Sequence, residues 1–127
     1  LIWRIQKMFN TKNLEELKNS ALIVRTGLEN LIINSTAYEG TTIEQAVAVF
    51  TVCDAIVSDV HDYLTYPEEY GNGNLDLFLR GMDYLLRGTH AEVTDFDTGV
   101  LQYCTDNLVL KHYANMIWLL RNRMYYA

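Results

Sequence analysis

The sequence has no lysine or arginine between Arg25 and Arg80, although it contains ten of these residues in total. The 54 residues between them carry nine carboxylates. The formal net charge is +3 for residues 1–28 (five bases, two acids), −12 for residues 29–106 (two bases, fourteen acids) and +3 for residues 107–127 (three bases). These add to the overall charge of −6. An acidic stretch of this length repels nucleic acid and anionic membranes and attracts basic protein surfaces. We therefore expect a protein partner and no direct binding to nucleic acid or membrane.

The sequence is also poor in residues that interrupt helices and in long apolar runs. It has a single proline, Pro67, and seven glycines, which favours long regular segments. No apolar run approaches the ~20 residues that span a bilayer, and no signal-peptide pattern is recognisable. We expect residues 1–12 to form an N-terminal extension or docking segment, and residues 13–127 to form one helical domain.

Only two cysteines are present, Cys53 and Cys104, and both fall within helical patterns. An unpaired cysteine in such a pattern usually fills the core as a small apolar side chain. We expect two reduced core thiols in a cytoplasmic protein, because thiols stay reduced in that compartment. The alternatives are a bridge between helices or a reactive thiol.

The motifs that usually mark a small enzyme are missing as well. The sequence contains no phosphate-binding glycine loop, no dinucleotide fingerprint, no Cys-x-x-Cys and no Gly-x-Ser-x-Gly. A helix-turn-helix protein would need a basic stripe where this chain has acids. We therefore expect a protein that is not an enzyme, with no catalytic residues, no cofactor and no metal ion.

What the sequence does contain is strong helical periodicity. The first segment repeats apolar residues at intervals of three and four, as in bundles and coiled coils: Leu14, Leu17, Ala21, Val24, Leu28 and Leu31. Residues 42–66 carry a broad apolar arc, typical of a central helix: Ala46, Val47, Phe50, Cys53, Val57, Val60 and Leu64, widened by Ile43, Val49 and Ile56. The third segment has the stripe Leu75, Phe78, Leu79, Met82, Leu85 and Leu86, and the last has Leu101, Cys104, Leu108, Met116 and Leu119.

Capping residues set the expected ends of these helices. Asn13 with Glu16, and Thr41 with Glu44, have the spacing of a capping box. Pro67 is expected to end the second helix, and residues 71–74 read as a turn. The fold class that follows is all-α: an antiparallel four-helix bundle with helices at about 14–34, 42–66, 75–87 and 95–124.

Two glycines interrupt otherwise good helical patterns. Gly27 and Gly81 each cost about 1 kcal/mol relative to alanine in a helix interior. The heptad pattern runs through Gly27 unbroken, so we expect one continuous helix there. For Gly81, the usual compensation is the close approach of another backbone.

Polar residues on helix faces supply the only candidates for chemistry. Asp54, Ser58, His61 and Asp62 line one edge of the second helix, where a carboxylate could orient the histidine. We favour a structural role, because no nucleophile or second acid set accompanies them. His112 and Asn115 lie on the apolar face of the last helix. They need hydrogen-bond partners there, since an unpaired buried polar group costs ~1–3 kcal/mol. A metal site built from His61, His112 and Asp54 is the alternative.

Two surfaces are predicted to bind a partner. The first is an acidic face made of Glu44, Asp54, Asp59, Asp62, Glu68 and Glu69. The second is an aromatic and arginine-bearing end, with residue types that dominate contact energies at interfaces: Tyr113, Trp118, Arg121, Arg123, Tyr125 and Tyr126. The predicted function is that of a small acidic, non-catalytic module that binds a basic protein and acts as its inhibitor or adaptor. Such a role would fit an accessory protein encoded by a virus or a mobile element.

Two other functions are open on the same residues. A bundle with an aromatic, arginine-bearing end also suits a self-assembling subunit, with homodimers the simplest case. A nucleic-acid mimic that blocks a DNA- or RNA-handling enzyme is the third possibility. Four acids over 18 residues of the second helix span ~27 Å, whereas duplex DNA places about 16 charges over that length, so the charge density is low for a mimic.

Overall fold

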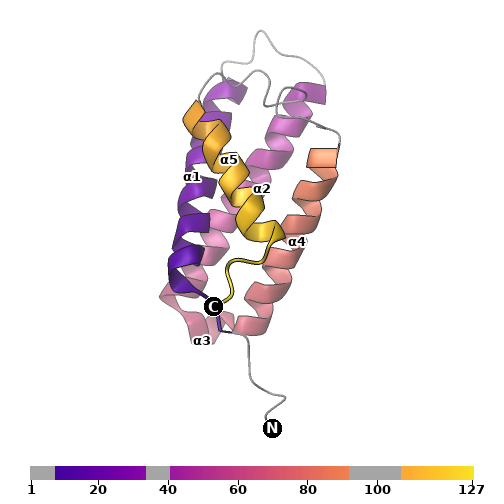
Figure 1. The fold of residues 1–127 in the computed structure, drawn as a ribbon. Coiled ribbons are helices and arrows are strands. Elements are labelled where there is room, and N and C mark those ends of the chain that lie inside the picture. The colour runs from indigo at the N-terminus through magenta and orange to yellow at the C-terminus, as the bar shows by residue number, and fades with distance from the viewer. Residues whose placement is uncertain (1–7, 34–40, 92–106) are drawn as a thin grey trace.

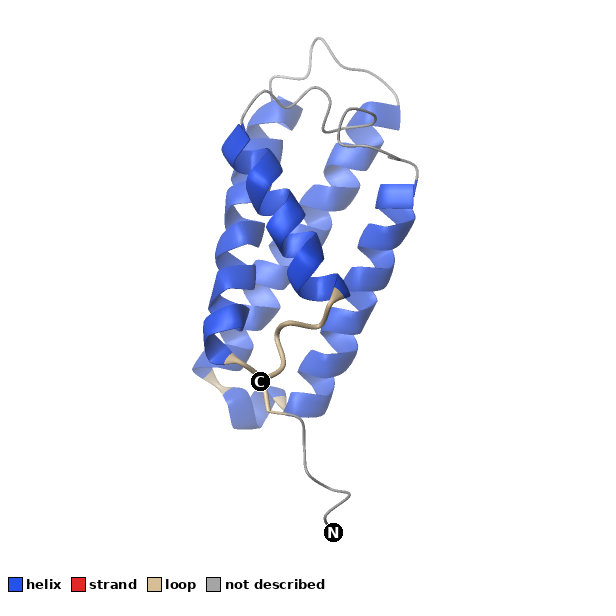
Figure 2. Cartoon of the chain, in the orientation of Figure 1, coloured by secondary structure: helices blue, strands red, loops and turns tan. Residues whose placement is uncertain are grey.

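The computed structural model describes residues 8–33, 41–91 and 107–127. Within these ranges the chain forms five helices and no strand (Figure 2): α1 (Thr11–Ile33), α2 (Thr41–Thr65), α3 (Pro67–Tyr70), α4 (Asn72–Ala91) and α5 (Asn107–Arg121). The predicted all-α helical bundle is confirmed.

Four long helices surround a common core, and α3 is a single turn between two of them. α1 packs against α2 and α5, and α4 also packs against α2 and α5. In Figure 1 the colour runs up α1, down α2, up α4 and down α5, which crosses the bundle obliquely. Each long helix therefore buries one side and leaves an outer face.

The core follows the apolar periodicity of the sequence closely in α1. Leu14, Leu17, Ala21, Val24 and Leu28 are all fully buried, and Leu31 is partly buried. The other helices contribute buried residues mainly from the predicted stripes: Ala46, Val49, Cys53, Ile56, Val60, Leu75, Leu79, Leu86, Met116 and Leu119. Three residues predicted to face inward are exposed instead: Val47, Leu85 and Leu108. Val47 and Leu85 lie at the edges of their apolar arcs, where a small error in helix rotation reverses the assignment. Leu108 lay within the predicted stripe, but the buried face of α5 is rotated toward Val109, Tyr113 and Leu120.

α1 begins earlier than the capping pattern predicted, at Thr11. The cap is Asn10, whose Oδ1 accepts a hydrogen bond from the backbone N–H of Asn13 at 3.1 Å. The expected box of Asn13 and Glu16 is wrong, because both side chains make tertiary contacts. Asn13 Nδ2 donates to the carbonyl oxygen of Met124 at 2.6 Å, and Glu16 accepts from Asn115 at 3.1 Å.

The segment around Pro67 contains a helix that the sequence did not predict. α2 ends at Thr65, close to the expected position, but Pro67 opens α3 rather than a loop. Gly71 then links α3 to α4 with φ of 89°, a conformation that favours glycine. α4 consequently starts at Asn72, inside the predicted turn, and continues past Gly88 to Ala91.

The described end of the chain folds back onto its beginning. α5 ends at Arg121 instead of the predicted 124, and the start expected at residue 95 lies outside the described residues. The backbone N–H groups of Asn10 and Ala127 donate to Tyr125 and Met8, each at 2.7 Å, around an isolated bridge between Phe9 and Tyr126. Of the segment expected at residues 1–12, residues 8–10 therefore contact the last residues of the chain, and residues 1–7 lie outside the described residues.

The two interior glycines have opposite surroundings. A Cβ on Gly27 would collide with Cγ2 of Val109 and lie 3.2 Å from its Cγ1, so this glycine permits the close approach of α1 and α5. A Cβ on Gly81 would meet no atom within 4 Å. The backbone approach expected at Gly81 is therefore not supplied by the described chain.

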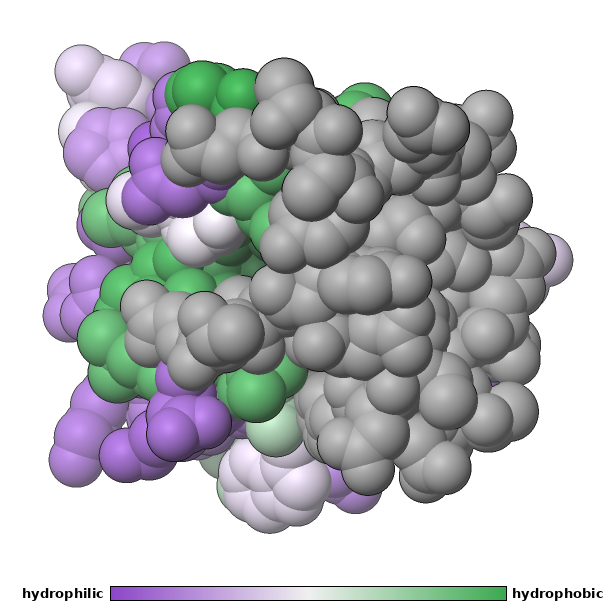
Figure 3. Space-filling view, turned by 90° about the horizontal axis from the view of Figure 1, so that it is seen from above, coloured by the Kyte–Doolittle hydropathy of each residue, from purple (hydrophilic) through white to green (hydrophobic). Residues whose placement is uncertain are grey.

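The upper end of the bundle exposes some apolar surface. Figure 3 looks down on this end and shows green apolar side chains between purple polar ones at one side. In the segments that meet there, Ile33 is 69%, Val47 44% and Leu108 53% exposed. Among the described helices, none combines the length and apolar character needed to cross a bilayer.

Candidate functional site

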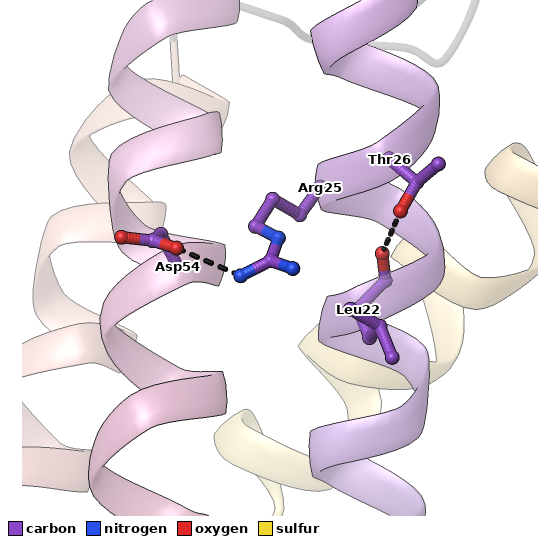
Figure 4. A network of polar contacts seen from close by, with 4 residues as sticks. All are labelled: Leu22, Arg25, Thr26 and Asp54. Atoms are coloured by element: carbon purple, nitrogen blue, oxygen red, sulfur yellow. Dashed lines mark hydrogen bonds and ion pairs between the residues drawn. The ribbon is translucent and has the colours of Figure 1, made fainter.

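The predicted acidic face divides into two parts in the structure. Asp54 lies midway along α2 and pairs with Arg25 of α1, with 2.8 Å between the Arg25 Nη1 and Asp54 Oδ1 atoms (Figure 4). Part of the charge segregation is thus neutralised within the fold. Glu44 lies in the first turn of α2, and its side chain is outside the described structure.

The remaining four carboxylates lie around the end of α2 and on α3. Asp62, Glu68 and Glu69 are exposed, and Asp59 is half-buried. Asp59 and Asp62 are three residues apart and share a face of α2, while Glu68 and Glu69 occupy the first turn of α3. In the described part of the chain, none of the four makes an ion pair. We call these four residues the acidic end.

The carboxylates of the acidic end influence each other and a neighbouring tyrosine. Burial, and then the negative charge of Asp62, raise the pKa of Asp59 above its ordinary value. Burial also raises the pKa of Tyr70, and Asp59 and Asp62 raise it further. The negative charges of α2 and the ring of α3 therefore share one neighbourhood, and no described cation offsets these charges.

Aromatic rings accompany these acids. Tyr66 comes directly after α2, its backbone N–H donates to the carbonyl oxygen of Asp62 at 2.8 Å, and its side chain is 58% exposed. The ring of Tyr63 contacts Phe9 and Tyr70 edge to face, at centroid distances of 5.3 and 6.1 Å. A hollow of about 290 Å³ adjoins this cluster, lined by Met8, Phe9, Thr11, Tyr63, Leu64, Pro67 and Asn72. The acidic end thus combines unpaired negative charge with rings that can pack on a partner.

The aromatic and arginine-bearing end is only partly a surface. Tyr113 and Tyr125 are buried in the core, at 2% and 1% exposure. Tyr126 is half-buried and stacks on Phe9 at a centroid distance of 5.3 Å. Trp118 is 52% exposed, and both Arg121 and Arg123 are exposed. A partner could reach the last three, whereas the two buried tyrosines stabilise the fold.

His112 and Asn115 find the partners that their inward position requires. Ser20 of α1, which is completely buried, lies 2.9 Å from Nδ1 of His112. Asn115 Nδ2 donates to Ser20 Oγ at 3.0 Å and to Oε1 of Glu16 at 3.1 Å. Because Asn115 donates to Ser20 Oγ, the hydroxyl hydrogen of Ser20 can go to an unprotonated Nδ1. Ser20 was missed from the sequence because it occupies a position adjoining the apolar stripe of α1.

These four residues border a hollow of about 620 Å³ between α1 and α5. Its other lining residues are Asn19, Lys111, Ala114 and Trp118. A serine close to a histidine suggests a nucleophile and its base. A nucleophile must reach its substrate, however, and Ser20 is fully buried and already engaged with two side chains. The arrangement is better explained as a polar link between the two helices.

The alternative metal site is not formed. His112 contacts α1, whereas His61 is exposed on α2 and Asp54 is paired with Arg25. Across the described ranges, no group of three ligating side chains could hold a metal ion. Cys53 is a free, buried thiol whose Sγ lies 3.7 Å from Met116 Sδ, and Cys104 lies outside the described residues.

Comparison of the chain with protein-family models, with curated proteins and with solved structures found no match in any of the three.

Proposed function

We propose that this protein is a non-catalytic binding module whose acidic end takes a basic segment of a partner protein. One observation carries the proposal: four carboxylates, Asp59, Asp62, Glu68 and Glu69, surround one end of the bundle without an ion pair in the described structure. The other described acids on the neighbouring helices include three that do pair, with Arg25, Arg80 and Arg87.

The electrostatics of Asp59 favour a cationic ligand. Its raised pKa means that burial and Asp62 disfavour the ionised form. A lysine or arginine placed between the two carboxylates would relieve that repulsion, so part of the binding energy comes from the free protein's own unfavourable charge. Binding should consequently lower the pKa of Asp59 and release protons at a pH close to that pKa.

The exposed ring of Tyr66 adds a second kind of contact. A guanidinium within ~6 Å of a ring centroid gains about 0.5–1 kcal/mol at an exposed site. Tyr66 is the exposed ring nearest in sequence to these carboxylates. Arginine-rich segments should therefore bind more tightly than lysine-rich ones of equal charge, because arginine both pairs with carboxylates and stacks on rings.

We propose that the protein acts in the cytoplasm as an inhibitor or an adaptor of that partner. The mimic of nucleic acid is less well supported, because Arg25 neutralises Asp54 midway along α2. Self-association through Trp118 and the arginines has a smaller surface than the sequence suggested, since Tyr113 and Tyr125 are buried.

A fluorescently labelled arginine–glycine peptide provides a direct test by fluorescence anisotropy. We expect binding that weakens as salt rises, because exposed charges are screened over ~10 Å at 0.1 M salt. The double variant Asp62→Asn with Glu69→Gln should weaken binding by up to ~30-fold, given up to about 1 kcal/mol for each exposed pair. Both residues are exposed, so the variant should fold.

The matched control is Glu15→Gln with Glu29→Gln, which removes the same charge from the exposed face of α1. This control should bind the peptide nearly as well as the native chain. Equal losses in the two variants would show a dependence on net charge alone, and no binding of the peptide at low salt would refute the proposal.

A further inference from the structure

The outer face of α4 is a second surface, separate from the acidic end. Leu77, Gly81 and Tyr84 follow at intervals of four and three residues, so they share one face of the helix. Leu77 is 69% and Tyr84 is 77% exposed, while Leu75 and Leu79 fill the core on the opposite face. Two large apolar side chains therefore border a glycine on the outside of the bundle.

Gly81 leaves a gap between the side chains of Leu77 and Tyr84 on this face. A Cβ there would meet no atom within 4 Å, so no packing inside the described chain explains the absence of a side chain. Alanine would stabilise the helix at this position. A glycine flanked by Leu77 and Tyr84 instead permits another helix to approach closely.

The charges along one edge of α4 indicate what that other helix is. Asp76, Arg80, Asp83 and Arg87 alternate in sign, and within the chain they pair as Asp76–Arg80 at 3.1 Å and Asp83–Arg87 at 2.9 Å. If a second copy of the helix runs in the opposite direction, with the point between Gly81 and Met82 of both copies at the same level, Asp76 lies level with Arg87 of the other copy and Arg80 with Asp83. An antiparallel second copy would thus bring this edge of each helix together with unlike charges opposed, whereas a parallel copy would leave the two edges on opposite sides of the contact.

We propose that two copies of this chain associate through α4, with the two helices antiparallel and crossing at Gly81. The arrangement is a closed two-fold dimer, in which the same patch of each copy is used. Leu77 of each copy lies within one helical turn of Tyr84 of the other, and the glycines at the crossing allow the backbones to approach. The charged edges then meet along one side of the contact.

The size of this face predicts a weak association. The 20 residues of α4 extend about 30 Å, and a helix is about 10 Å wide, so the contact buries on the order of 600 Å² in total. Stable complexes usually bury at least ~1,200 Å². We expect a dimer that dissociates on dilution and forms at micromolar to millimolar protein concentrations.

Sedimentation equilibrium of the full chain over that concentration range tests the proposal. We expect a monomer–dimer equilibrium that Gly81→Gln weakens by ~10-fold or more, because a long side chain at the crossing separates the backbones. The control is Thr26→Gln, which places the same side chain at an exposed position of α1, a helix that packs against α2 and α5. Gly81 has open space for the new side chain and Thr26 is exposed, so both variants should fold, with the native helical signal and a thermal midpoint at or above that of the native chain.

Disulfide cross-linking tests the orientation. In a Cys104→Ser background, Leu77→Cys chains mixed with Tyr84→Cys chains should cross-link to each other faster than either does to itself. A monomer at every concentration, a dimer indifferent to Gly81→Gln, or preferred 77–77 cross-links would each overturn the proposal. The acidic-end variants should leave the dimer unchanged, so the two proposals fail independently.

Discussion

Arg123 shows how a single residue can hold a conformation that its side chain disfavours. Its φ of 51° lies in the left-handed region, where glycine is the usual residue. The N–H of Arg123 donates to Leu120 at 3.2 Å and that of Met124 to Leu119 at 2.9 Å, the two hydrogen bonds of a Schellman motif. This turn ends α5 and directs the last residues toward Asn10.

Arg123→Gly should raise the free energy of unfolding by about 1 kcal/mol, because glycine adopts the left-handed conformation without a Cβ clash. Urea denaturation at low protein concentration measures the change. Arg123→Ala is the control: it removes the same charge and keeps the strain, so its stability should stay near that of the native chain. A glycine variant no more stable than the alanine variant would contradict the assignment.

At the scale of elements, Gly27 and Gly81 occupy similar sequence contexts and opposite environments. Gly27→Ala should lower the free energy of unfolding by about 1–2 kcal/mol, because both methyls of Val109 lie too close to the new Cβ and α5 must move. Gly81→Ala should raise it by up to ~1 kcal/mol through helix propensity alone. Urea denaturation below the concentration of the proposed dimer measures both.

The double variant Gly27→Ala with Val109→Ala tests the cause of the first effect. Trimming Val109 removes the two methyls that a Cβ at residue 27 would meet, so adding Gly27→Ala to Val109→Ala should cost little. A full loss in that background would show that the glycine is needed for another reason.

For the whole molecule, stability should fall in alkaline solution. Burial raises the pKa of the Cys53 thiol from 9.0 to about 12 and that of Tyr113 from 10.0 to about 12. The unfolded chain therefore loses these protons at lower pH than the folded chain. Their contribution is complete below pH 9 and is lost as the pH rises toward 12, by up to ~1.4 kcal/mol per pH unit for each group.

Urea midpoints measured from neutral pH to above pH 10 follow this loss. Tyr113→Phe removes one of the two groups, so its stability should decline less steeply than that of the native chain above pH 10. An equal slope in the two proteins would show that Tyr113 does not titrate as its burial requires.

Periodicity predicted the long helices, but not α3, and most of the described core, because burial repeats with the helical turn, as in α1. It could not predict which polar residue would meet another across the bundle. Ser20, which joins His112 and Asn115, depends on how α1 and α5 pack, and that packing depends on Gly27 and Val109. The cap at Asn10 was missed because Asn13 has a similar local signal and a tertiary use for its side chain.

The candidate surfaces were predicted with mixed success for a related reason. A run of acids shows where charge lies along the chain but not which acids acquire a cation from another helix, as Asp54 does from Arg25. Aromatic residues near a helix end have the same composition whether they are buried, like Tyr113, or exposed, like Trp118. Only the rotation of α5 separates the two.

The pairing of residues 8–10 with residues 124–127 bears on how the protein matures during synthesis. The amide of Asn13 reaches the carbonyl of Met124, and the backbone of Met8 reaches Ala127, across almost the whole described chain. Within the described ranges these contacts have the greatest sequence separation, so we expect them to form late. The start of α1 cannot form these contacts until Ala127 has emerged from the ribosome. Nascent chains stalled before that point should therefore be cut by proteases near Asn10.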